Sequence, residues 1–344
     1  MQSYLRGVRG WDFLFSKDPP AQRSRGFLFK LIMKDIMFKT IVYFAFSFLL
    51  PVIITIAACN RPIPPEALID DIGSHIQPIP APQRIVSLAP SNTEIVYALG
   101  LGDRLVGVTE YCNYPPEAKK KTLIGGFSTV DIEKTVALQP DLILATDIHS
   151  KSATPTLQKI GFDVITLNPR TLEAVLKDIA LVGKITGQDD QSQALVENLR
   201  KRIDAISSKT GLLQQDQRPR VLLLLWHDPL MAAGKGTLID DLISVAGGLN
   251  IAQDVTGHQA ISLEAVITRN PDVIIVPISM GKEESPLWNY VNTEPRLKTV
   301  NAVKNGRLYL IEGDIALRYG PRSIQALEQF AGYIHPELFP SESK

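Results

Sequence analysis

Histidine is the side chain of this sequence with the widest range of possible chemistry. The chain contains five, namely His75, His149, His227, His258 and His335. None pairs with another at a metal-binding spacing such as His-x-x-x-His, so we expect polar surface or cleft residues rather than metal ligands. His227 and His258 are the two exceptions worth testing, because both follow segments that are expected to face a cleft.

An aromatic residue, Trp226, directly follows the aliphatic run 220–225 and precedes His227. Ligands of α/β sheets gather beyond the carboxyl ends of the strands, and an aromatic wall there suits a large flat ligand. Trp226 could equally pack into the core, and the sequence leaves both alternatives open.

Enzymatic chemistry has little support in this sequence. Gly234-Lys235-Gly236-Thr237 resembles a phosphate-binding loop only superficially, because its lysine falls between the glycines instead of following the second one. The chain has no Gly-x-Ser-x-Gly element and no evident acid–base pair. Its two cysteines are too few for a metal–thiolate site. We therefore expect a protein that is not an enzyme and has no catalytic cofactor.

An internal repeat is the most informative feature of the sequence. Residues 131–143 (DIEKTVALQPDLI) match residues 262–274 (SLEAVITRNPDVI), with Glu, Pro and Asp in the same register. Glu133 and Glu264 occupy equivalent positions, and each could simply complement the positive end of a helix dipole. Alternatively, two lobes related by pseudo-symmetry would present equivalent carboxylates to basic residues of a two-fold symmetric partner.

The elements that must position these residues alternate between aliphatic strands and helices. We expect strands at 84–88, 105–108, 142–145, 164–167, 220–225, 273–276 and 308–311. Helices are expected at 131–138, 154–160, 189–209 and 323–333. A further helix is expected to begin at Ser91 or Asn92, with Glu94 at capping-box distance, and to end at Gly100. This alternation predicts an α/β fold with mostly parallel sheets.

The order of these elements predicts two similar lobes joined by a long connecting helix. We place the N-terminal lobe at 84–186, the connecting helix at 187–213 and the C-terminal lobe at 214–340. Before the first lobe, residues 59–83 are rich in proline and indicate a semi-rigid tether. Within this segment, residues 69–76 alternate around a glycine turn and predict a small hairpin that would open the folded domain.

The first 58 residues predict export. They hold eight basic and three acidic residues, which leaves a mildly acidic remainder that argues against a nucleic-acid partner. An apolar run ends in Ala57-Ala58-Cys59, which resembles the lipobox of bacterial lipoproteins, so residues 1–58 would be a signal peptide and Cys59 the lipidated residue. Met33 or Met37 would give a signal of ordinary length. An uncleaved transmembrane helix is the alternative.

Three further segments carry a specific resemblance. These are Arg84–Glu94 (RIVSLAPSNTE), Tyr111–Ala118 (YCNYPPEA) and Asp314–Arg322 (DIALRYGPR). Together they resemble ABC-importer substrate-binding proteins that have a helical backbone between their lobes and that serve uptake of vitamin B12, iron-siderophores and haem. The likeness covers residues 84–335 and is greatest for the vitamin B12 (cobalamin) binders.

The resemblance implies a site, a ligand and partners. The ligand would be a corrinoid held between the lobes, and the partners would be a permease dimer with its ATPase subunits, a membrane through the lipid anchor, and no nucleic acid. The protein itself would be a monomer facing the periplasm or the cell exterior. Glu133 and Glu264 would dock on permease arginines. The implied ligand contacts are Tyr111, Asp314, Ile315, Ala316, Leu317 and Arg318.

Two positions depart from the cobalamin binders. Phe127 and His258 align where those proteins have tryptophans beside the ligand, and Phe127 keeps an aromatic face whereas His258 could ligate a metal. An iron-siderophore or haem receptor of the same fold is therefore a second hypothesis. A membrane-tethered enzyme acting on a metal chelate is a third, which steady turnover of ligand would support.

Overall fold

A computed structural model describes residues 68–79, 81–278 and 285–340. The predicted signal peptide and Cys59 lie outside these ranges, as does the tether up to residue 67. Those interpretations therefore stay predictions. Within the described ranges, no helix combines the length and the apolar character that crossing a membrane requires.

The N-terminal lobe is built on a parallel sheet in the order β5-β4-β3-β6-β7. Its strands are β3 (Ile85–Ser87), β4 (Leu105–Val108), β5 (Thr122–Leu123), β6 (Leu142–Thr146) and β7 (Val164–Leu167). Its helices are α2 (Pro90–Ala98), α3 (Ile132–Ala137) and α4 (Ala153–Ile160), with short 3-10 turns at Gly102–Arg104, Pro116–Lys120 and Asp147–His149. The strands are aliphatic on both faces, because helices cover both sides of a parallel sheet.

The C-terminal lobe repeats this plan and adds two antiparallel strands. The sheet order is β11-β9-β8-β12-β13, with β10 paired to β8, and β9 and β11 are the antiparallel members. The strands are β8 (Arg220–His227), β9 (Leu230–Ala233), β10 (Leu249–Asn250), β11 (His258–Ala260), β12 (Val273–Ile278) and β13 (Leu308–Glu312). The helices are α7 (Leu238–Val245), α8 (Leu263–Arg269), α9 (Pro286–Thr293), α10 (Asn301–Lys304), α11 (Gly313–Ala316) and α12 (Ser323–Ile334), with 3-10 turns at Gln215–Gln217 and Pro295–Thr299.

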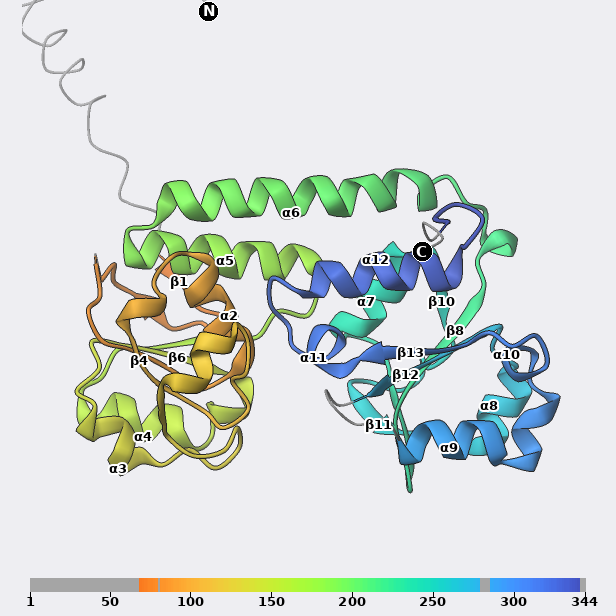
Figure 1. Cartoon of the computed structure of the whole chain (residues 1–344), viewed down its shortest axis with the longest axis horizontal. Helices are drawn as coiled ribbons and strands as arrows, with labels where there is room; N and C mark the ends of the chain where they lie inside the picture. Colours follow the sequence, from red (N-terminus) through yellow and green to blue (C-terminus); the bar gives the residue numbers. More distant parts are fainter. Residues whose placement is uncertain (1–67, 80, 279–284, 341–344) are drawn as a thin grey trace, which may run out of the picture. The chain divides into compact units, whose positions relative to one another are not determined.

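Two long helices connect the lobes. Helix α5 (Leu172–Thr186) packs on α6 (Asp189–Thr210), which also contacts α7 and α12 of the C-terminal lobe (Figure 1). At about 1.5 Å per residue, the 22 residues of α6 span roughly 33 Å, enough to lie across both lobes. A Cβ at Gly183 would collide with Ser192, so glycine lets α5 and α6 approach closely. The predicted two-lobed α/β fold with a long connecting helix is therefore confirmed.

Alternate residues along each strand belong to different cores. In β6, Leu142 and Leu144 face α2 and α5, whereas Ile143 and Ala145 face α3 and α4. The first of these clusters is continuous across both lobes and includes apolar residues of α5, α6, α7 and α12. The outer face of each sheet has a separate core of its own. The two lobes therefore share one core on the side of the connecting helices.

The internal repeat corresponds to equivalent structures in the two lobes. Asp131 and Ser262 cap α3 and α8, and each side chain accepts a hydrogen bond from the backbone N–H three residues later, at 3.0 and 3.1 Å. The repeated aspartates, Asp141 and Asp272, both bind the backbone at the start of the first strand of their lobe. Sequence similarity here reflects the same strand–helix–strand unit used twice.

Two predictions about the N-terminal lobe need correction. Residues from Leu68 form a hairpin of β1 (Leu68–Ile69) and β2 (His75–Ile76), but the backbone of this region bonds to the lobe itself, so the tether does not extend to residue 83. The capping box on α2 is also wrong. The helix begins at Pro90, before Ser91, so its N-cap is Ala89, which has no side chain that can cap it, and Glu94 pairs with an arginine of the other lobe.

Candidate ligand-binding cleft

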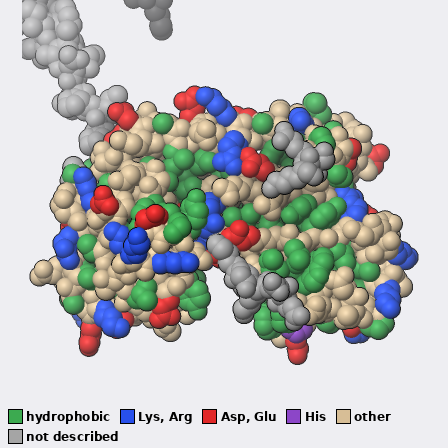
Figure 2. All heavy atoms as spheres, in the orientation of Figure 1, with side chains coloured by type: hydrophobic (Ala, Val, Ile, Leu, Met, Phe, Trp, Pro, Cys, Tyr) green, Lys and Arg blue, Asp and Glu red, His purple; other side chains and the backbone are tan. Residues whose placement is uncertain are grey.

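A cavity of about 790 Å³ lies between the two lobes. It is lined mainly by residues at or just beyond the carboxyl ends of β3, β6 and β7 in one lobe and of β8, β12 and β13 in the other. This is the edge where parallel sheets generally place ligands. In Figure 2 the molecular surface is notched between the lobes, on the side away from α6.

Most of the residues that the sequence nominated as ligand contacts meet in this cavity. The lining includes Tyr111, Phe127, Trp226, His258, Asp314, Leu317 and Arg318. Ile315 and Ala316 do not line it, because α11 turns both side chains into the shared core, where they are 3% and 0% exposed. The predicted contact loop therefore presents three of its five residues to the cavity. The other two have a packing role.

Phe127 forms an aromatic wall in the N-terminal lobe and is positioned by a buried histidine. The His149 Nε2 lies 2.7 Å from the Phe127 carbonyl oxygen, and its ring meets the Phe127 ring edge-on with centroids 5.5 Å apart. Nδ1 accepts a bond from the Thr146 backbone N–H at 3.1 Å, so Nε2 carries the donated proton. Burial lowers the pKa of His149, which keeps the ring neutral. Sequence reasoning missed this residue and placed it on the surface or in the cleft.

Trp226 is the matching wall of the C-terminal lobe. It stands at the end of β8, lines the cavity and is 49% exposed, so it is not packed into the core. Its indole Nε1 donates to the Asp228 carbonyl oxygen at 2.8 Å, which fixes the ring from within its own turn. His227 is not part of the described lining, and its ring lies between those of Trp226 and Tyr290, with centroids 5.1 and 5.9 Å away.

His258 does line the cavity, at the start of β11. Its Nε2 lies 3.2 Å from the hydroxyl of Tyr319. Burial and then the charge of Arg170 lower the pKa of His258, so the imidazole is neutral at pH 7. Burial raises the pKa of Tyr319 to about 12, so its hydroxyl stays protonated. In the part of the chain that the structure describes, no three His, Cys, Asp or Glu side chains cluster as a metal site.

The charged groups of the cavity occur as opposite pairs. Arg170 Nη2 lies 2.7 Å from Asp147 Oδ2, and Arg318 Nη2 lies 2.7 Å from Asp314 Oδ1. With its amide nitrogen toward Asp147, Asn168 donates to Asp147 Oδ2 at 3.2 Å and accepts from Arg170 Nη2 at 3.1 Å. The described lining therefore combines aromatic walls with side-by-side donors and acceptors and no net charge.

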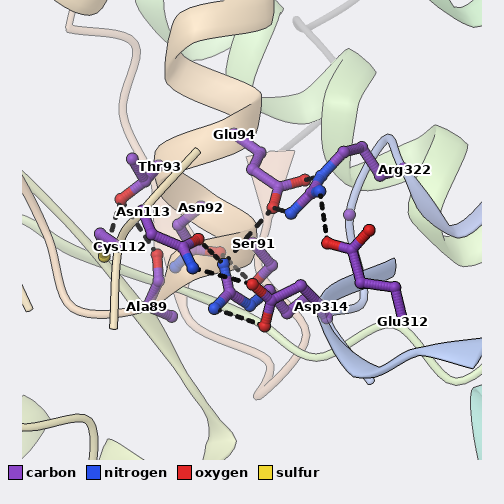
Figure 3. Close-up of polar contacts among 12 residues, drawn as sticks. Ala89, Ser91, Asn92, Thr93, Glu94, Cys112, Asn113, Glu312, Asp314 and Arg322 are labelled. Carbon is purple, nitrogen blue, oxygen red and sulfur yellow. Dashed lines mark hydrogen bonds and ion pairs between the residues drawn. The ribbon is translucent and has the colours of Figure 1, made fainter. Parts of the chain in front are cut away.

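A buried polar network joins the lobes at the back of the cavity. Arg322 binds Glu94 with two hydrogen bonds, Nη2 to Oε1 at 2.7 Å and Nε to Oε2 at 3.0 Å (Figure 3). Asn113 of the same lobe as Glu94 donates to Asp314 Oδ2 at 2.8 Å and accepts from Arg318. Because both side chains of the Glu94–Arg322 pair are less than a tenth exposed, this contact is held out of water.

The two predicted docking carboxylates are exposed at the first turns of equivalent helices. Glu133 lies in α3 and Glu264 in α8. Figure 1 places both helices on the side of their lobes away from α6. Glu264 Oε1 is 3.8 Å from Arg296 Nη1, whereas Glu133 forms no ion pair within the described residues. Both carboxylates can therefore be reached by a partner that approaches this face.

Comparison with known sequences gives related proteins over most of the chain. The sequence profile of the periplasmic binding protein family matches residues 85–315. The uncharacterized ABC transporter substrate-binding lipoprotein YvrC of Bacillus subtilis is 34% identical over 263 residues, covering 75% of this chain and 82% of the relative. The vitamin B12-binding protein of Vibrio cholerae is 29% identical over 260 residues, covering 75% and 91%.

Solved structures of similar proteins agree in fold but differ in ligand. The periplasmic vitamin B12-binding protein BtuF of Vibrio cholerae superposes with a TM-score of 0.66 at 29% identity, over 74% of this chain and 96% of that one. The periplasmic haem-binding protein RhuT of Roseiflexus sp. RS-1 also gives a TM-score of 0.66, at 28% identity over 74% and 99%. The fold alone does not distinguish these two ligands.

Proposed function

Because the chain belongs to the periplasmic binding protein family, we propose that it captures a corrinoid such as cobalamin between its two lobes and delivers it to an ABC importer. It would act as a monomer outside the cytoplasmic membrane, anchored through Cys59, and would bind its ligand without chemical change. Its partner would be a permease dimer with ATPase subunits.

The observation that carries the corrinoid proposal is the paired charge of the cavity. A corrinoid is a large macrocycle whose rim carries neutral carboxamides, and each carboxamide offers both a donor and an acceptor. Asp147 with Arg170, and Asp314 with Arg318, present acceptors and donors side by side. Haem carboxylates and anionic siderophores would instead favour unpaired cations. Phe127 and Trp226 supply apolar walls for the ring.

Calorimetric titration of the chain from residue 60 with cyanocobalamin and dicyano-cobinamide tests this proposal. We expect micromolar or tighter binding to at least one corrinoid, and no binding to either would refute the assignment. Trp226→Ala should weaken binding by about tenfold, since a stacked aromatic contributes on the order of 1 kcal/mol beyond its buried area. Trp288→Phe is the matched control, because Trp288 packs against the separate core of the C-terminal lobe.

We further propose that Glu133 and Glu264 dock the loaded protein on the permease. Their equivalent positions on α3 and α8 suit a partner with two-fold symmetry, and exposed carboxylates suit arginine side chains. The double variant Glu133→Ala, Glu264→Ala should abolish uptake and leave corrinoid affinity intact. Glu197→Ala on α6 is the control, because this exposed carboxylate bonds only within its own helix. Unchanged uptake in the double variant would contradict the docking role.

His258 supports a second candidate, a receptor for a haem or for an iron chelate. A neutral imidazole in a cavity can donate a lone pair to a metal, and its neighbour Tyr319 could orient the ring. Adding haemin should then shift the absorption spectrum of the wild-type protein but not that of His258→Ala. Identical spectra for both proteins would remove this candidate.

A further inference from the structure

The N-terminal hairpin is attached to the edge strand of its lobe by two adjacent aspartates. Asp70 Oδ1 accepts bonds from two amides of its own turn, and Asp70 Oδ2 accepts from the Thr166 N–H of β7 at 3.1 Å. The Asp71 backbone N–H donates to the Thr166 carbonyl oxygen at 3.1 Å. The hairpin therefore bonds to both the backbone N–H and the carbonyl oxygen of Thr166 in β7.

Asp71 also reaches the wall of the cavity. Its Oδ2 accepts a hydrogen bond from the Asn168 backbone N–H at 2.5 Å. Asn168 is the first residue after β7 and lines the cavity, and with its amide nitrogen toward Asp147 its side chain bonds to both Asp147 and Arg170. One residue thus connects the hairpin, through its backbone, to the donor–acceptor pair of the cavity, through its side chain.

A second carboxyl lies behind Asp71. Asp178 of α5 is 2% exposed, and its buried Oδ2 has no hydrogen-bond partner among the described donors. The Asp71 carboxyl is the charged neighbour within reach of it. Burial, followed by the like charge of Asp71, raises the pKa of Asp178 to about 8. Of the described charged groups on the hairpin, β7, α5 and α6, Asp71 is the one whose field acts on Asp178. At pH 7 Asp178 is therefore protonated and can donate to the Asp71 carboxylate.

We propose that Asp71, with Asp178 behind it, is a positioning residue of the ligand cavity. Asp178 orients the Asp71 carboxylate, Asp71 holds the Asn168 backbone, and Asn168 keeps Asp147 and Arg170 side by side at the polar edge of the site. The role of this edge in ligand binding rests on the proposed function. The mechanical link from the hairpin to Asn168 does not, and can be measured without ligand.

Residue-resolved amide hydrogen exchange of the ligand-free protein tests the mechanical link. Asp71→Ala should speed exchange of the Asn168 amide by about ten- to a hundredfold at pH 7, because the amide loses a charged acceptor. Asp163→Asn is the matched control, an exposed carboxylate at the other end of β7, and should leave Asn168 unchanged. Unchanged Asn168 exchange in Asp71→Ala would overturn the proposal whatever the ligand is.

The role of Asp178 is tested by the pH profile. Protection of the Asn168 amide in the wild type should fall as pH rises through about 8, when Asp178 ionises and repels Asp71. Asp178→Asn keeps a neutral donor and should retain full protection without this step, whereas Asp178→Ala should lose protection at all pH values. A step that persists in Asp178→Asn would show that another group causes it.

Ligand affinity then tests the positioning role itself, with cyanocobalamin as the probe. Asp71→Ala should weaken binding by at least about fivefold, and Asp178→Asn should bind as the wild type does. Faster Asn168 exchange in Asp71→Ala with unchanged affinity would refute the positioning role. If the wild type binds no corrinoid, the proposed function is refuted. The exchange measurements still show whether Asp71 holds the Asn168 backbone.

Discussion

The two lobes begin from the same unit and hold the aromatic walls that face the cavity by different means. In the N-terminal lobe the aromatic wall, Phe127, depends on His149, which is distant in sequence and buried. In the C-terminal lobe the wall, Trp226, is fixed by a carbonyl two residues away. The position of Trp226 should therefore be insensitive to substitutions elsewhere in its lobe, whereas the position of Phe127 should change when His149 is replaced.

The lobes also differ in how they fasten their first strand. Asp141 accepts bonds from the Gln83 and Arg84 amides at 2.6 and 2.9 Å, and among the described residues no side chain bonds to that carboxylate. Asp272 accepts from the Arg220 amide, from two nitrogens of the Arg220 guanidinium and from Asn301, all at 3.0 Å. The same repeated aspartate therefore carries more interactions in the second lobe.

Breaking the buried Glu94–Arg322 ion pair between the lobes should have the largest effect on stability. Glu94→Gln removes the closer counter-charge of the buried Arg322 and leaves only Glu312, whose Oε1 lies 3.7 Å from Arg322 Nη1, so the free energy of unfolding should fall by about 3 kcal/mol. Urea denaturation at pH 7 measures the loss, with the exposed Glu117→Gln as the control. A loss below about 1 kcal/mol would mean that this ion pair contributes little and that the shared core and the Asn113 contacts hold the lobes together.

Replacing His149 should disturb the Phe127 wall and leave the Trp226 wall in place. His149→Gln should cost about 2 kcal/mol of stability at pH 7.5, because two buried partners lose their bonds, and should weaken cyanocobalamin binding. Burial lowers the pKa of His149 in the folded protein, so its contribution is present above about pH 6.5 and is lost as pH falls below that value. Denaturation curves from pH 7.5 to 5 should therefore converge for wild type and variant. His75→Gln, an exposed histidine, is the control.

Most helices and strands of this fold could be predicted from the sequence, because aliphatic runs and N-cap residues mark them within a few neighbouring residues. The aliphatic runs at β4 and β7 gave the strand bounds to the residue, and the caps Asp131 and Ser262 gave the starts of α3 and α8. The short antiparallel strands β9 and β11 were missed. They contain little periodic pattern, and their pairing depends on contacts within the lobe.

The cavity was predictable in part, and its supporting residues were not. Tyr111, Trp226 and Asp314 follow strands or stand in recognisable segments, so their place at the cleft could be inferred. Glu94 was taken for a helix cap because its partner, Arg322, is 228 residues away. His149 lies in a short turn after β6, and no neighbouring residue indicates that its ring is buried against Phe127. Long-range partners decide such roles.

The two repeated aspartates, Asp141 and Asp272, should differ in how much they stabilise the folded protein. Asp272→Asn should lower the free energy of unfolding by about 2 kcal/mol and Asp141→Asn by about 1 kcal/mol, after allowance for solvent screening. Burial opposes ionisation of Asp272, but bonds from Arg220 and Asn301 outweigh it and lower its pKa to about 2. Its contribution is therefore present above about pH 4 and is lost as pH falls toward 2. Equal losses in the two variants at pH 7 would contradict the difference between the lobes.

The smallest effect should come from the proposed docking face, where Arg296 lies near Glu264 but mainly binds Glu294, with its Nε 2.8 Å from Glu294 Oε1. Arg296→Ala should free Glu264 and strengthen binding to the permease–ATPase complex by about twofold at low salt, since exposed charges interact weakly. Surface plasmon resonance can measure this change, with Lys298→Ala in the same 3-10 turn as the control. Weaker docking of Arg296→Ala would show that Arg296 itself contacts the permease. The C-terminal lobe would then dock through an ion pair that has no counterpart at Glu133 within the described residues.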